Sequence, residues 1–111
     1  MNTLHADGRE IALDKDGFLQ QLEDWSPAVA GELAAREGIA LGDSHWAVLH
    51  ALRDFYQEFQ LSPATRPLVK YTATRLGADV GNSATLNRLF NGTPAKLAAK
   101  LAGLPKPTNC I

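Results

Sequence analysis

Cysteine is almost absent from this chain of 111 residues, whose only thiol, Cys110, lies one residue before the end. A single cysteine cannot form an internal disulfide, and it cannot supply the several thiolates that zinc and iron–sulfur sites require. His45 and His50 are five residues apart, which does not place them on one face of a helix as a pair of metal ligands. We therefore expect neither a metal site nor a cofactor.

Long apolar runs are also missing. No stretch approaches the ~20 consecutive apolar residues that cross a bilayer. Residues 1–5 lack the basic and apolar regions of a secretory signal. These two absences predict a cytoplasmic protein without a membrane partner.

The usual signatures of enzymes that turn over small molecules do not occur either. The sequence contains no glycine-rich phosphate loop, no recognisable Ser-His-Asp set and no pair of acidic residues with an obvious pocket. The residues alone thus predict no active site for the turnover of a small molecule.

Charge is distributed unevenly along the chain, although its net value is only −1. Residues 1–65 carry eleven acidic and four basic side chains, a net charge of −7, whereas residues 66–111 carry one acidic and seven basic side chains, a net charge of +6. Cations near Cys110 would favour its thiolate, and a basic surface would attract an acidic partner or RNA. The alternative is that these charges only solvate helix faces.

Turn and capping signals predict a mostly α-helical fold, a small bundle of about five or six helices with an N-terminal β-hairpin and a flexible C-terminal arm. Asp7-Gly8 is a strong hairpin signal. Ser26-Pro27 and Thr93-Pro94 each combine a capping side chain with a proline at the first helical position, where no backbone donor is lost. The expected helices cover about residues 14–23, 27–37, 43–60, 67–76, 83–90 and 94–102.

The longest of these helices, residues 43–60, carries a wide apolar stripe. Its members recur at spacings of three and four, which is the pattern of a central core helix; they are Trp46, Leu49, Leu52, Phe55, Tyr56 and Phe59. An aromatic stripe could also stack nucleic-acid bases, but at helical spacing a core role is far more common.

The last residues should form an arm rather than continue the final helix. Gly103 is a helix stop, and Pro105 and Pro107 fix two φ angles and remove two backbone donors. We expect one helical domain over residues 1–103 and a mobile arm over residues 104–111 that carries Cys110 and contributes little to stability. Chain ends are often disordered, so a terminal cysteine without a role is the alternative.

Several segments resemble the TusE/DsrC family of sulfur-carrier proteins. The C-terminal segment, residues 101–111, reads LAGLPKPTNCI and is similar to the end of that family, where the penultimate cysteine carries sulfur as a persulfide. The resemblance extends to Asp16-Gly17-Phe18-Leu19, Trp25-Ser26-Pro27, His45-Trp46 and Pro67-Leu68-Val69-Lys70, in the same order and at similar spacing. It implies the fold of this family and makes Cys110 the expected catalytic residue.

The position eleven residues before Cys110 separates two branches of this family. Members that partner dissimilatory sulfite reductase resemble one another in having a second cysteine there, and this chain has Ala99. The resemblance therefore implies the single-cysteine, TusE-like branch: a sulfurtransferase in the sense of a persulfide carrier, in a relay that delivers sulfur for 2-thiolation of the wobble uridine of tRNA. The implied partners are an upstream persulfide donor complex and a tRNA 2-thiouridylase, with contact to the bound tRNA left open.

Basic side chains near the arm are the expected sites for holding the anionic persulfide or docking the acceptor, namely Arg66, Lys70, Lys100 and Lys106. Two other functions stay open. Short helices and a basic second half would suit a helical DNA-binding regulator, although no expected helix concentrates Arg, Asn and Gln as a recognition helix does. The chain could also be a DsrC-like partner of a sulfite-reductase-type complex, against which the missing second cysteine argues.

Overall fold

An antiparallel β-hairpin begins the fold. The computed structural model describes residues 2–107. In it β1 (Asn2–Ala6) pairs with β2 (Arg9–Leu13) through a two-residue turn in which Asp7 and Gly8 both have positive φ, 54° and 70°. These angles match the right-handed twist of the strands. The apolar face of the hairpin packs against the first helix, so the predicted hairpin is confirmed.

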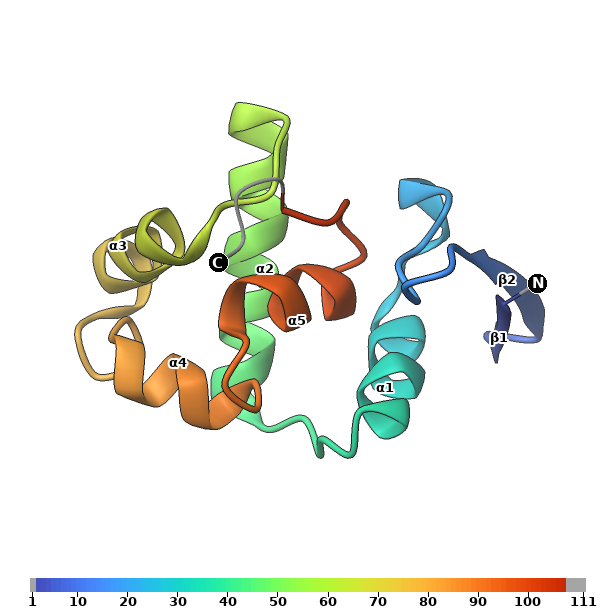
Figure 1. The fold of residues 1–111 in the computed structure, drawn as a ribbon, viewed down its shortest axis with the longest axis horizontal. Helices are drawn as coiled ribbons and strands as arrows, with labels where there is room; N and C mark the ends of the chain where they lie inside the picture. Colours follow the sequence, from blue (N-terminus) through green and yellow to red (C-terminus); the bar gives the residue numbers. More distant parts are fainter. Residues whose placement is uncertain (1, 108–111) are drawn as a thin grey trace.

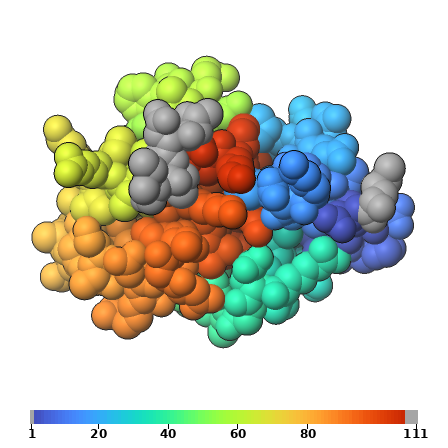
Figure 2. All heavy atoms as spheres, viewed as in Figure 1, coloured from blue at the N-terminus to red at the C-terminus, as the bar shows by residue number. Residues whose placement is uncertain are grey.

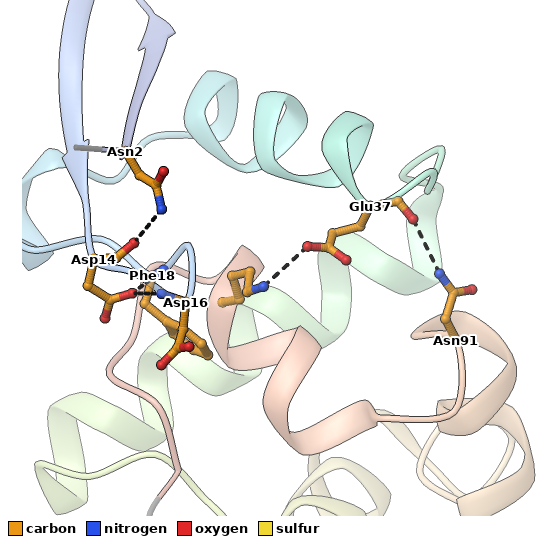
Figure 3. Close-up of polar contacts among 7 residues, drawn as sticks. Asn2, Asp14, Asp16, Phe18, Glu37 and Asn91 are labelled. Carbon is orange, nitrogen blue, oxygen red and sulfur yellow. Dashed lines mark hydrogen bonds and ion pairs between the residues drawn. The ribbon is translucent and has the colours of Figure 1, made fainter.

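The segment after the hairpin is not the helix that we predicted over residues 14–23. The Asp14 carboxylate accepts the backbone N–H groups of Asp16 and Phe18 at 2.9 and 3.0 Å (Figure 3). Gly17, at φ 88°, turns the chain back, so that Leu19 bridges to Leu13. A helix cannot form around this turn, and only a short 3₁₀ turn, η1 (Leu22–Asp24), follows.

The next two helices begin where their caps were expected. Ser26 accepts the N–H of Val29 at the start of α1 (Pro27–Arg36). α2 (Asp43–Phe59) is the longest helix, and Gln60 ends it in the left-handed conformation. Both sequence predictions are confirmed to within a residue or two at each end.

Two shorter helices follow α2. α3 (Thr65–Leu76) begins two residues before Pro67, where we had predicted its start, so this proline lies inside the first turn and still displaces no hydrogen bond. α4 (Ser83–Leu89) is capped by Asn82, whose side chain accepts the N–H of Thr85 at 2.8 Å.

The last helix, α5 (Pro94–Leu101), lies at the centre of the molecule. It contacts each of the other four helices, and Figure 1 shows it in front of α2, with α1 on one side and α3 and α4 on the other. Ala98 and Ala99 are fully buried, and such small side chains let neighbouring helices approach closely. The core therefore forms around α5, although the apolar stripe of α2 had pointed to α2.

After α5 and the two residues that end it, the chain stays against the domain over residues 104–107, which we call the arm base. Leu104 is 2% exposed and belongs to the main hydrophobic core, and Pro107 is also buried. The Ser62 hydroxyl donates to the carbonyl of Pro105 at 2.5 Å. These contacts hold the first four residues of the expected arm against the domain, and the remainder of the arm, residues 108–111, lies outside the described residues.

A pair of truncations tests the packing of the arm base. Deleting residues 104–111 should lower the free energy of unfolding by about 2 kcal/mol or more, because it removes the buried Leu104 side chain. Deleting residues 108–111 leaves every contact described above in place and should change it little. Urea unfolding followed by circular dichroism measures both. Equal stability of the two truncated chains would contradict the packing seen here.

Candidate functional site

The end of α5 determines where the arm leaves the domain. Gly103 has a φ of 74°, its N–H donates to the carbonyl of Lys100 at 3.1 Å, and the N–H of Leu104 donates to that of Ala99 at 2.9 Å. This pair of bonds, with a left-handed glycine, is the Schellman motif that ends many helices. Gly103 therefore stops the helix as predicted and directs Leu104 back into the core.

Two side chains from other helices and loops hold the last carbonyls of α5. Trp25 Nε1 donates to the carbonyl of Leu101 at 2.8 Å, and Arg53 Nη1 donates to that of Ala102 at 2.6 Å. The Arg53 guanidinium also lies over the Trp25 ring, 4.1 Å from its centroid. Burial lowers the pKa of Arg53 from its ordinary value. We call these two side chains the α5 clamp.

Position 103 also requires glycine because the α5 clamp lies too close to leave room for a side chain. A Cβ atom at this position would lie 2.4 Å from Cδ1 of Trp25, far inside the contact distance of two carbon atoms. Glycine is thus selected at position 103 twice, by the left-handed backbone and by the close indole ring.

Acidic side chains from the first half of the sequence neutralise two of the predicted basic residues. Lys100 Nζ lies 3.2 Å from Glu37 Oε2, and the Lys100 side chain is only 14% exposed. The dashed line from the side-chain carboxylate of Glu37 in Figure 3 marks this ion pair. Lys106 Nζ lies 3.6 Å from Asp16 Oδ2 and so ties the arm base to the turn over residues 14–18. Both lysines thus have structural partners, and an anion-binding role for either stays a prediction.

The other two predicted basic residues, Arg66 and Lys70, are exposed on α3. They follow shortly after Ser62, which holds the arm base through Pro105. The four predicted residues therefore fall into two groups: Lys100 and Lys106 pair with acidic side chains, whereas Arg66 and Lys70 lie exposed on α3. Cys110 itself lies outside the described residues, three residues beyond Pro107.

Sequence reasoning did not assign Trp25, Arg53 or Ser62 to this site. Their partners in the hydrogen bonds lie 76, 49 and 43 residues away along the chain, so no local pattern could reveal these contacts. One signal was available for Arg53, which is a single basic residue within the apolar stripe of α2 and therefore needs a polar partner.

Comparison with known proteins identifies the family to which this site belongs. The family model described as "DsrC like protein" matches residues 5–111. The chain belongs to this family. Sulfurtransferase TusE of Sodalis glossinidius is 53% identical over 104 residues, which are 94% of this chain and 96% of that protein.

Solved structures of DsrC proteins have the same fold. The structure of Allochromatium vinosum DsrC is similar with a TM-score of 0.90 and 43% identity, over 99% of this chain and 98% of that one. The oxidised γ-subunit of dissimilatory sulfite reductase (DsrC) from Archaeoglobus fulgidus is similar with a TM-score of 0.85 and 38% identity, over 99% and 100%. The mostly helical fold with an N-terminal hairpin, expected from the resemblance, is thereby confirmed.

The described residues were expected to hold neither a metal site nor a membrane span. Within residues 2–107, no group of three or more His, Cys, Asp and Glu side chains is placed to hold a metal ion. Over the same residues, no helix has both the length and the apolar content for a membrane span.

A glycine pair tests the contact between Gly103 and the α5 clamp. Gly103→Ala should be destabilised by the left-handed backbone, about 1–2 kcal/mol, and in addition by the clash with Trp25. Gly92, at φ 85° with open space around its Cβ position, provides the matched control, since Gly92→Ala meets only the backbone cost. Chemical denaturation of both variants should show the larger loss for Gly103→Ala. Equal losses would mean that Trp25 moves aside without cost.

Proposed function

We propose that this chain is a sulfur-relay protein that accepts a persulfide sulfur on Cys110 from an upstream donor complex and passes it to a tRNA 2-thiouridylase for 2-thiolation of the wobble uridine. The observation that carries the proposal is 53% identity to a sulfurtransferase TusE over almost the entire length of both proteins. The cysteine one residue from the end, which the DsrC-like family model includes in its match, supplies the reactive atom.

The transfer needs no oxidant and no metal, because the sulfur moves as a sulfane atom. The Cys110 thiolate attacks the terminal sulfur of the donor's persulfide, the donor's S–S bond breaks, and the donor cysteine leaves as a thiolate while a new S–S bond forms on Cys110. In the second step a thiolate of the acceptor attacks the terminal sulfur on Cys110 in the same way. Each step returns one thiolate and leaves the number of S–S bonds unchanged.

The absence of a second cysteine matters for the second step. Ala99, where the two-cysteine relatives carry their other thiol, is fully buried in α5. A persulfide on Cys110 therefore has no internal thiol that could displace its sulfur as sulfide and form a disulfide. The sulfur stays on Cys110 until the nucleophile of the acceptor arrives, which is the behaviour that a relay requires.

A second candidate function is that of a partner in a sulfite-reductase-type complex. It is favoured by the structural similarity to the Archaeoglobus fulgidus γ-subunit of dissimilatory sulfite reductase. The identity to that protein, 38%, is lower than the 53% to sulfurtransferase TusE, and Ala99 removes the second thiol. We therefore prefer the relay to tRNA.

Replacing the thiol tests the carrier proposal directly. After incubation with a cysteine desulfurase relay system, the intact protein should gain roughly 32 Da per sulfur atom by mass spectrometry. Cys110→Ser should gain nothing, and its melting temperature should equal that of the parent chain because the change lies outside the packed arm base. Sulfur loading that persists in Cys110→Ser would exclude this cysteine as the carrier.

A further inference from the structure

Two large apolar side chains are exposed in the described part of the chain, and they lie close together in the sequence. Phe59, at the end of α2, is 48% exposed, and Leu61, in the loop that follows, is 53% exposed. Neighbouring exposed apolar residues at one end of a small domain are typical of an interaction surface.

An open groove continues this apolar surface between α2 and α3. It has a volume of about 260 Å³ and is lined mainly by aromatic and other apolar groups, from Phe55, Phe59, Pro67, Lys70, Tyr71 and Thr74. The rings of Phe55 and Phe59 pack at a tilt with their centroids 4.6 Å apart, and the rings of Phe55 and Tyr71 are nearly perpendicular with their centroids 5.0 Å apart. The floor of the groove is thus a packed aromatic cluster, and such a floor is ready to receive an apolar side chain.

The charges around the groove have a definite arrangement. Arg66 and Lys70 are exposed one helical turn apart on α3, whose sequence contains no acidic residue. The facing part of α2 carries Asp54, which pairs with Arg75 at 3.5 Å, and Glu58. The carboxylates on α2 would repel the continuous phosphates of an RNA, whereas a protein can place single acidic side chains opposite α3. The arrangement therefore favours a protein partner.

This surface borders the point where the arm leaves the domain. Leu61 precedes Ser62, which holds Pro105, and Figure 2 shows the red end of the described chain between the tip of α2 and the blue turn after the hairpin. From Pro107 to Cys110 the chain can extend by at most about 11 Å. A partner that takes sulfur from Cys110 must therefore lie against the domain close to the arm base.

We propose that Phe59, Leu61, Arg66, Pro67 and Lys70 form the docking surface for the protein that accepts sulfur from Cys110. The acceptor would present an apolar side chain to the groove and acidic side chains to Arg66 and Lys70. This inference rests on the proposed function and adds to it the part of the chain that recognises the acceptor. It assigns Arg66 and Lys70 to docking, and leaves Lys100 and Lys106 to their ion pairs with Glu37 and Asp16.

The test uses the full chain and a purified tRNA 2-thiouridylase as the acceptor. We measure three quantities: the dissociation constant of the complex with this enzyme, the affinity for tRNA alone, and the rate at which labelled sulfur is transferred from loaded Cys110. The proteins compared are the parent chain and the variants Leu61→Ser, Phe59→Ser and Lys70→Glu. Arg88→Glu, an equal change of charge at an exposed position on α4, is the control. Melting temperatures of all variants show whether the fold is kept, and Leu61→Ser, in a loop, should keep it even if Phe59→Ser does not.

We expect the dissociation constant to rise at least about tenfold for Phe59→Ser and Leu61→Ser and several-fold for Lys70→Glu, with slower transfer and unchanged loading of Cys110. Arg88→Glu should stay within about twofold of the parent chain. Higher salt should weaken the parent complex more than the Lys70→Glu complex.

Three outcomes would overturn the proposal, and they can be told apart. If the parent chain binds the acceptor and transfers sulfur, and Leu61→Ser and Lys70→Glu do the same within about twofold, the docking surface is wrong and the relay function stands. If the variants keep their affinity for the acceptor protein but lose affinity for tRNA alone, the surface binds RNA instead. If the parent chain loads sulfur but neither binds the thiouridylase nor transfers to it, the proposed acceptor is wrong, and the docking surface is rejected with it.

Discussion

The burial of α5 is the constraint on which the rest of this structure depends. A helix packed against four others ends away from water, so its last carbonyl groups need donors from the protein itself. Each carbonyl from residue 98 to residue 102 has one: the N–H groups of Ala102, Leu104 and Gly103 serve the first three, and Trp25 and Arg53 serve the last two. The same bonds that complete the helix fix the direction in which the arm base leaves it. Structural stability and the placement of the arm base thus depend on one set of contacts.

The opposite charges of the two halves of the sequence meet in the folded chain. Three ion pairs each join a basic residue of the second half to an acidic residue of the first: Lys100 to Glu37, Lys106 to Asp16 and Arg75 to Asp54. The pairs of Lys106 and Arg75 are largely exposed, and such pairs contribute little to stability, about 0–1 kcal/mol each. The main effect of all three pairs is on where positive charge remains, because each pair neutralises one basic side chain of the second half. Arg66 and Lys70, on α3 at the apolar groove, are not among the neutralised side chains.

Local signals in the sequence were sufficient for most of the elements. The hairpin at Asp7-Gly8 and the start of α1 at Ser26-Pro27 depend on neighbouring residues only, and both were predicted correctly. The predicted helix over residues 14–23 was wrong, because the chain turns at Asp14 and Leu19 bridges back to the hairpin, a contact that no helical pattern encodes. The α5 clamp and the packing of the arm base were missed for the same reason, since their partners are distant in sequence. The proposal that Cys110 carries sulfur came from family resemblance, and no physical pattern in the chain could replace that resemblance.

The short distance between Pro107, which is buried, and Cys110 also has a kinetic meaning. If Cys110 carries sulfur as proposed, three residues of chain keep that sulfur within about 11 Å of Pro107, which corresponds to an effective concentration on the order of 0.3 M for any group that enters this sphere. A thiolate of a docked partner would then meet the persulfide at a concentration far above that of any free thiol in solution. A loosely attached tail of the same composition, released at residue 104, would spread the sulfur over a volume several times larger. On the proposed function, the packing of four residues would thus concentrate the reactive sulfur at one place on the surface.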